Sequence, residues 1–227
     1  MLARLAQSPI ATPLRALVNL GLGSTPRRVI VRGGAARGAR LELNLRREKA
    51  YWLAHYEPPL QRFFADTVAA DDVVYDVGAH IGFFTVLAGR LGARVFAFEP
   101  VPASVERLRT NVELNDIDGT VVPAAAWRDG GGVALHFGPT FEQARVDGSG
   151  PAPSVSLDDF ASTHPAPTVL KIDAEGAEGE ILRGAARLLR DGRPLTIVCE
   201  LHGSDARADV LAQLAGFDVE ELGANGG

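Results

Sequence analysis

The sequence contains one cysteine, Cys199, among its 227 residues. No disulfide can form within the chain, so we expect it to work in a reducing, cytoplasmic compartment. Cys199 lies in the apolar run 195–201, and no activating base stands near it in the sequence. This pattern favours a small core residue over a catalytic thiol.

Long hydrophobic runs and a basic excess are also missing. No stretch has the roughly 20 apolar residues that a membrane-spanning helix needs. Residues 1–20 contain Pro9 and Pro13 and lack the continuous apolar core of a signal peptide. Surface attachment through this segment stays open as an alternative. The net charge of −5 argues against a nucleic-acid partner, because binding to phosphates usually requires an excess of Lys and Arg.

From residue 73 onward, short apolar runs alternate with amphipathic segments. Such a pattern is typical of a parallel sheet that helices cover on both faces. We therefore predict an α/β fold with a doubly wound, mostly parallel, Rossmann-like sheet. The predicted strands are 73–77, 94–98, 120–124, 168–172, 195–201 and 217–222, and the predicted helices are 58–69, 82–91, 101–114, 177–190 and 205–215.

The N-terminal part has a different pattern. The alternating runs 28–32 and 40–45 flank a glycine-rich turn, which predicts a β-hairpin. We expect two units: an N-terminal extension at 1–50, made of a helical lead-in and this hairpin, and the main domain at 51–227. Within the main domain, the Gly- and Pro-rich stretch 129–153 predicts a short hairpin with loops, and Ser156 is expected to cap a short helix.

Glycines and an acidic residue follow the first strand of the main domain. In doubly wound folds ligands bind beyond the carboxyl ends of the strands. Gly78 and Gly82 allow a tight turn and a close backbone approach, and Thr85 stands on the first helical turn. Asp76 ends an apolar strand, where a charge needs a partner. A glycine pair alone is common in strand-to-helix turns. The prediction of a ligand site therefore depends on Asp76 and on a second acid at the end of the next strand.

Glu99 ends the second strand, followed by Pro100, and lies 21 residues after Gly78. A ribose-binding acid stands about 20 residues after the glycine loop in nucleotide-binding folds. The loop does not have the G-x-G-x-x-G spacing of a dinucleotide enzyme. A cofactor without phosphates, such as S-adenosylmethionine, suits the two acids better. Ala126 follows the third strand, where an adenine ring would lie, although a packing role explains it equally well.

A second group of polar residues ends the fourth and fifth strands. Lys171 interrupts an apolar strand, Asp173 and Glu175 follow it, and Glu200 and His202 end the next strand. A carboxylate or histidine here can take the proton of a hydroxyl group that accepts a methyl group. Asp173, Glu200 and His202 could alternatively hold Mg²⁺, and Asp173 and Glu175 could simply cap a helix. Glu178 and Glu180 are predicted to face solvent.

Several of these segments together resemble the FkbM family of O-methyltransferases. The resemblance covers residues 50–203 in order, and the combination of its glycine loop with its KIDAEG segment is specific. It is carried by Tyr56-Glu57 before the first strand of the main domain, VYDVGAHIGFFT (74–85), VFAFEP (95–100), Asn111 and Asn115, SLDDF (156–160), KIDAEGAE (171–178) and CELH (199–202).

The resemblance implies methyl transfer from S-adenosylmethionine to a hydroxyl of a sugar, glycan or polyketide-type small molecule. It places Asp173 at the reacting centre, and Asp76, Gly78, His80, Gly82 and Glu99 at the cofactor. His80 departs from the family, which more often has Asn there. The usual seventh strand has no obvious counterpart, so we expect a trimmed chain or an edge built by another segment or chain.

Three alternatives remain at this point. A methyltransferase acting on nitrogen would usually carry an Asn/Asp-Pro-Pro-aromatic loop after the fourth strand, where this chain has 173–176. A non-catalytic module that binds an adenosyl ligand has the same fold, because a fold does not fix a function. The third open point is the oligomeric state, since the N-terminal hairpin could form a homodimer. The acceptor cannot be identified from the sequence, because acceptor pockets lie in variable loops.

Overall fold

A computed structural model describes residues 25–137, 144–202 and 204–222. Its centre is a five-stranded sheet in the order β11-β10-β3-β4-β5, with all neighbours parallel. The chain runs outward from β3 through β4 to β5 and then returns to the other side of β3, so the strand order reverses between β3 and β10. The strands are β3 (Val73–Val77), β4 (Arg94–Phe98), β5 (Gly119–Val122), β10 (Val169–Ile172) and β11 (Thr196–Cys199).

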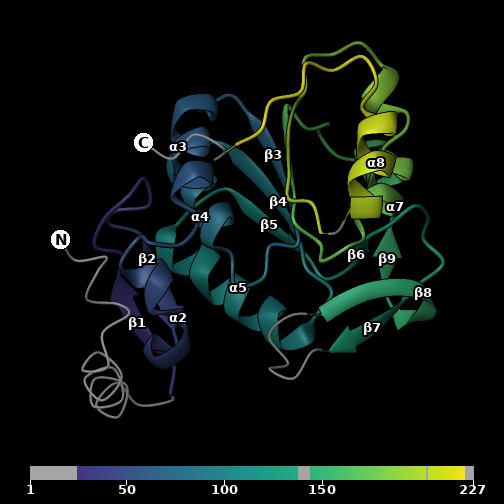
Figure 1. Cartoon of the computed structure of the whole chain (residues 1–227). Coiled ribbons are helices and arrows are strands. Elements are labelled where there is room, and N and C mark those ends of the chain that lie inside the picture. Colours follow the sequence, from purple (N-terminus) through teal and green to yellow (C-terminus); the bar gives the residue numbers. More distant parts are fainter. Residues whose placement is uncertain (1–24, 138–143, 203, 223–227) are drawn as a thin grey trace.

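Helices cover both faces of this sheet (Figure 1). Val74, Val95 and Val169 point to one face and share a hydrophobic cluster with α3 and α4. Tyr75 and Leu170, one residue further along, point to the other face and pack with α6, α7 and α8. This alternation confirms the doubly wound α/β prediction. The helices are α3 (Pro58–Thr67), α4 (Phe83–Arg90), α5 (Pro102–Asn115), α6 (Leu157–Ala161), α7 (Glu178–Arg183) and α8 (Ser204–Gln213), with a 3₁₀ turn η2 (Leu188–Arg190).

The predicted N-terminal hairpin is confirmed as the antiparallel pair β1 (Arg27–Ile30) and β2 (Arg40–Leu43). The sequence did not reveal the helix that follows it, α2 (Leu45–Trp52), whose N-cap is Asn44. The side-chain amides of Asn111 and Asn115 on α5 exchange hydrogen bonds with the backbone of β2. The hairpin thus packs against α5, one of the helices of the main sheet. Helix α2 spans residue 50, where the boundary between the two units was expected, and the division into two units stays a prediction.

Smaller elements complete the structure. The hairpin expected within 129–153 is confirmed as β7 (Val133–Phe137) and β8 (Ala144–Ala152), and β6 (Ala125–Ala126) pairs with β9 (Ser154–Val155). Ser156 caps α6 as expected, since its side chain accepts the Asp159 N–H. Among the described residues, no helix has both the length and the apolar character needed to cross a membrane.

Two predicted elements were wrong in extent or type. The helix expected at 177–190 ends at Arg183 with Gly184 as its C-cap, and Gly184 packs so closely on Trp127 that a Cβ atom would lie 2.1 Å from the Trp127 carbonyl oxygen. The sixth strand, expected at 217–222, is absent from the described residues, which show only an isolated bridge from Ala215 to Phe217. Residues 1–20, the expected helical lead-in, lie outside the described part.

Candidate active site

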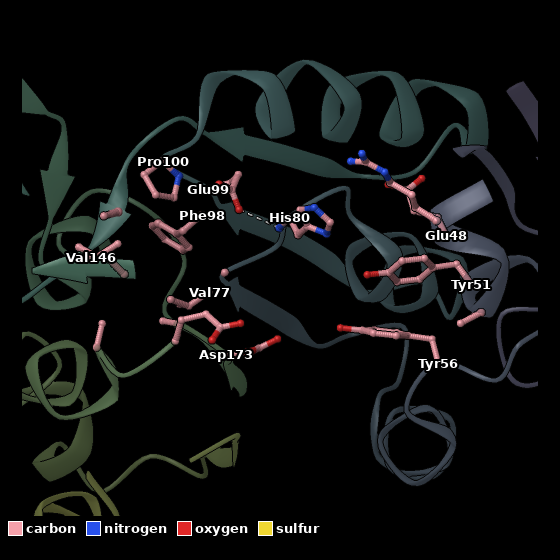
Figure 2. A pocket seen from close by; sticks show the side chains of 18 residues that line it. Glu48, Tyr51, Tyr56, Val77, His80, Phe98, Glu99, Pro100, Val146 and Asp173 are labelled. Atoms are coloured by element: carbon pink, nitrogen blue, oxygen red, sulfur yellow. Dashed lines mark hydrogen bonds between the residues drawn. The ribbon is translucent and has the colours of Figure 1, made fainter. Parts of the chain in front are cut away.

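A cavity of about 410 Å³ opens beyond the carboxyl ends of β3, β4 and β10, at the point where the strand order reverses. Its size is in the range of small-molecule sites. In Figure 2, Phe98, Pro100 and Val146 lie on one side of it and Tyr51 and Tyr56 on the other, with Glu99, His80 and Asp173 between them. Of the predicted site residues, it is lined by Gly78, His80, Glu99, Pro100, Ala126, Asp173 and Glu175.

Glu99 is almost fully buried at the wall of this cavity. Its Oε2 accepts the His80 N–H at 2.9 Å, and its Oε1 accepts the Val101 N–H at 2.8 Å. Burial raises the pKa of Glu99 to about 6, although these two hydrogen bonds oppose the rise. Each oxygen keeps a lone pair, so the carboxylate can still accept two hydroxyl groups.

The loop that holds Glu99 has a special backbone. His80 has a φ of 51° and Gly78 a φ of 72°. Histidine and asparagine are both enriched in this left-handed region, so the departure from the family's usual Asn leaves the turn intact. At Gly78 a Cβ atom would lie 1.8 Å from the Asp173 carbonyl oxygen. Glycine therefore lets the loop after β3 close onto the end of β10.

Asp76 and Thr85 were predicted at the cofactor, but both are fully buried and neither lines the cavity. Thr85 Oγ1 donates to Asp76 Oδ2 at 2.6 Å, and Lys171 Nζ lies 3.1 Å from Asp76 Oδ1. Gly82 is also away from the cavity, because its missing Cβ makes room for Leu108. In this structure these three residues support the glycine loop, and their contact with a cofactor stays a prediction.

Lys171 is buried and donates to the Gly78 carbonyl oxygen at 3.1 Å. Its Nζ also lies 3.7 Å from Asp173 Oδ2. Burial alone would lower the pKa of Lys171, but the charges of Asp76 and Asp173 outweigh it and raise the pKa. The lysine therefore stays protonated and acts as a fixed cation behind the cavity, which excludes it as a proton acceptor at neutral pH.

The predicted group at the ends of β10 and β11 does come together. His202 Nε2 lies 4.0 Å from Asp173 Oδ1, 3.8 Å from Glu175 Oε2 and 3.6 Å from Glu200 Oε1. Burial lowers the pKa of His202, but the hydrogen bond to Glu178 and the surrounding carboxylates outweigh it and raise the pKa. Burial and then the charge of Asp173 raise the pKa of Glu200.

This group has the chemistry of a site for a divalent cation as well as for a base. Single ligand atoms of Asp173, Glu175 and His202 lie within 4.8 Å of one another, and so do those of Glu57, Asp173 and Glu200. Oxygen-rich sets of this kind suit Mg²⁺, although exposed carboxylates often cluster without an ion. Burial raises the pKa of the Cys199 thiol to about 12, which disfavours the thiolate form that a nucleophile needs.

Sequence reasoning missed four residues of this region. Tyr51 and Tyr56 line the cavity with ring centroids 4.2 Å apart, and burial raises both pKa values, that of Tyr51 to about 12. Glu57 bonds Tyr56 and shares the acidic group. Glu178, expected to face solvent, is fully buried and bonds His202. Only the Tyr56-Glu57 pair had a sequence signal, as part of the family resemblance.

A parallel sheet whose strand order reverses beside a glycine loop, with an acid at the end of the next strand, is the arrangement of doubly wound nucleotide-binding folds, to which class I methyltransferases belong. A model of the methyltransferase FkbM domain matches residues 76–219 of this chain. The chain therefore belongs to the FkbM methyltransferase family, and it is a methyltransferase.

Two named relatives are also methyltransferases. The hexuronic acid methyltransferase AglP of Haloferax volcanii is 29% identical over 167 residues, which are 70% of this chain and 68% of that protein. Methyltransferase 1 of Beauveria bassiana is 28% identical over 182 residues, covering 66% of this chain and 73% of that protein. A solved structure of precorrin-6y C5,15-methyltransferase from Geobacter metallireducens is similar at a TM-score of 0.43, with 21% identity over 68% of this chain and 70% of that chain.

Proposed function

We propose that this methyltransferase moves a methyl group from S-adenosylmethionine to a hydroxyl group of a sugar, and that a uronic acid is the first acceptor to test. The observation that carries the cofactor part is Glu99. Its carboxylate stands at the end of β4 and lines the cavity, and each oxygen accepts one backbone N–H group and keeps capacity for a further hydrogen bond. A pair of ribose hydroxyls satisfies such an acceptor.

The remaining cavity residues fit the same ligand. Val77, Phe98, Ala125, Ala126 and Val146 provide an apolar wall, and the small side chains of Ala125 and Ala126 leave room for an adenine ring. Asp173 and Glu175 make the far end acidic, which suits the positive sulfonium and ammonium groups. When bound, S-adenosylmethionine supplies an activated methyl group. The chain's own contribution is to hold the ribose at Glu99 and to place acids next to the reacting end.

The sugar acceptor is supported by two independent facts. The named relative from Haloferax volcanii acts on a hexuronic acid and aligns over 70% of this chain. In addition, the cavity presents the rings of Tyr51 and Tyr56 beside the acidic group, and aromatic rings commonly pack on the apolar faces of sugars. A hydroxyl group needs a nearby base for methylation, and the group around Asp173 and His202 provides candidates.

Calorimetry and a transfer assay test the proposal. Purified protein is titrated with S-adenosylmethionine, S-adenosylhomocysteine and NAD, and the titrations are repeated with Glu99→Ala. We expect micromolar binding of the two adenosyl compounds, none of NAD, and loss of binding in the variant. Absence of adenosyl binding to the wild type would refute the cofactor part.

The acceptor is tested separately by methyl transfer to p-nitrophenyl β-D-glucuronide, followed by mass spectrometry. A methyl ether on the sugar supports an oxygen acceptor, and transfer only to amine-bearing analogues would support the nitrogen alternative. Tight cofactor binding without any transfer would favour a binding module. The assay is run with Mg²⁺ and with EDTA, since loss of transfer in EDTA would assign the acidic group to a cation.

A further inference from the structure

Glu178 is a fully buried carboxylate at the start of α7. Its Oε1 accepts the Gly176 N–H at 2.9 Å and lies 2.8 Å from His202 Nδ1. A buried carboxylate is unfavourable unless its partners compensate it. The residues on either side, Gly179 and Ala177, are also buried, so the first turn of α7 faces the protein interior rather than solvent.

The bond to Glu178 decides which nitrogen of His202 can accept a proton. An ionised carboxylate only accepts hydrogen bonds, so Nδ1 must carry the hydrogen. In the neutral imidazole the other nitrogen, Nε2, then has the free lone pair. That nitrogen faces Asp173 and Glu175, which both line the cavity, at 4.0 and 3.8 Å.

We propose that His202 is the base of the methyl transfer and that Glu178 is its positioning residue, which rests on the function proposed above. The acceptor's O–H bond breaks as its proton passes to Nε2, and the oxygen bonds the methyl carbon while the electron pair of the methyl–sulfur bond stays on sulfur. The surrounding carboxylates stabilise the imidazolium that forms. Glu178 holds the ring in the Nδ1–H tautomer before the step and does not touch the acceptor.

The Glu178–His202 pair resembles the acid–histidine pair of a catalytic triad, in which a buried carboxylate orients a histidine without itself being protonated. Imidazole is also better suited than a carboxylate to accept a proton near neutral pH. Asp173 has Lys171 at 3.7 Å, and Glu175 is more exposed than His202, with side-chain exposures of 36% and 27%. Asp173 and Glu175 are therefore better placed to orient the acceptor hydroxyl than to take its proton.

The test uses Glu178→Gln, because glutamine keeps the shape but removes the negative charge that favours Nδ1–H, and its NH₂ group can donate to Nδ1 once the amide turns its oxygen away from the Gly176 N–H. The matched control is Glu180→Gln, two residues along the same helix, whose side chain is paired with Arg183 at 2.8 Å on the surface. The tautomer of His202 is measured by ¹⁵N NMR of histidine-labelled protein, and its signal among the 5 histidines is assigned with His202→Gln. We expect Nδ1–H in the wild type and in the control, and a substantial Nε2–H population in Glu178→Gln.

Kinetics with p-nitrophenyl β-D-glucuronide provide the second readout. We expect Glu178→Gln and His202→Gln each to lower kcat by about 10²-fold, the scale of a single general base. The KM values and the S-adenosylmethionine affinity should stay within about threefold, and the double variant should lose little more than either single variant, because the two side chains act as one unit. A merely structural Glu178 would instead change stability and affinity together.

Three outcomes overturn the proposal. They are an Nε2–H tautomer in the wild type, an unchanged kcat in Glu178→Gln, and additive losses in the double variant. If the wild type binds S-adenosylmethionine but methylates no sugar, the proposed acceptor fails, and the role of His202 as the base fails with it. The positioning of the ring by Glu178 is then decided by the tautomer alone, so the two failures remain distinguishable.

Discussion

Asp76 and Glu99 lie at the ends of neighbouring strands of the same sheet, but their carboxylates differ in partners and in exposure. The Asp76 carboxylate meets a buried ammonium group on Lys171 and a hydroxyl on Thr85, and it has no exposed surface. The Glu99 carboxylate accepts hydrogen bonds from the backbone N–H groups of His80 and Val101 and borders the cavity. The comparison teaches that two acids at the ends of neighbouring strands can differ in exposure and partners, since the buried Asp76 is paired with Lys171 while Glu99 borders the cavity.

The largest expected effect comes from removing the cation. Lys171→Met leaves Asp76 as a buried charge without compensation, so we expect a loss of about 3–5 kcal/mol in the free energy of unfolding. Equilibrium unfolding in urea measures it. The double variant Asp76→Asn/Lys171→Met, which removes both charges, should recover a large part of the loss. A loss below about 1 kcal/mol in the single variant would contradict the structural role of the pair.

Glu99→Gln tests the other side of the comparison. The substitution replaces one accepting oxygen by a donating NH₂ group, so the side chain can no longer serve two amides and two hydroxyls. We expect S-adenosylmethionine affinity to fall by about 1.5–3 kcal/mol, the usual strength of a hydrogen bond to a charged group. Calorimetry measures the affinity, and circular dichroism confirms the fold. Unchanged affinity would place the ribose elsewhere in the cavity.

The raised pKa of Glu99 predicts that the affinity for S-adenosylmethionine depends on pH. Burial raises that pKa from 4.5 to about 6, so the ligand-free side chain loses its charge as the pH falls through 6. The ribose hydroxyls bind the charged form, and affinity should therefore be about tenfold weaker at pH 5 than at pH 7.5. The free energy of unfolding of the ligand-free protein changes in the opposite sense. The pKa of Glu99 is higher in the folded than in the unfolded chain, so protonation of Glu99 stabilises the fold at low pH, and this contribution is lost as the pH rises from 4.5 to 6.

Calorimetric titration across this pH range measures the effect, with Glu99→Gln as the matched control. The variant lacks the titrating group, so its remaining affinity should show no step near pH 6. A step of equal size in the variant would assign the pH dependence to another group, such as the acidic residues around His202.

The smallest effect is expected for an ion pair that faces solvent. Arg94 and Asp118 lie 2.8 Å apart with side-chain exposures of 54% and 61%. Asp118→Asn should change the free energy of unfolding by about 0.2–1 kcal/mol, as is usual for surface pairs. Urea unfolding in low and high salt measures this. A loss as large as that of Lys171→Met would show that burial is not what separates the two pairs.

The sequence predicted the sheet because hydrophobic periodicity depends on local residue order, and five of the six predicted strands of the sheet are confirmed. It failed at 217–222, where Phe217 and Val219 alternate with acids but Val219 and Leu222 are 54% and 50% exposed. Alternation predicts a strand only if a partner strand is available, and the sequence does not say whether one is. It also missed α2, since its short amphipathic pattern overlaps the end of the hairpin.

The site was predicted less completely than the fold. Strand ends identified Glu99, Asp173 and His202 as candidates, because parallel strands bring their carboxyl ends to one edge. The same argument could not tell Asp76 from Glu99, since whether Lys171 lies beside a given acid depends on the pairing of β10 with β3. Glu178 was missed because helical periodicity does not indicate which face of a six-residue helix is buried.

The sequence by itself thus determined the α/β class, the position of the glycine loop and the acids at the strand ends, because each follows from local periodicity and spacing. The tertiary structure alone decided which acids receive a buried cation, which border the cavity, and which carboxylate holds His202. These outcomes depend on contacts between strands and helices that are distant in the sequence, and on the burial that sets the free energy of each charge.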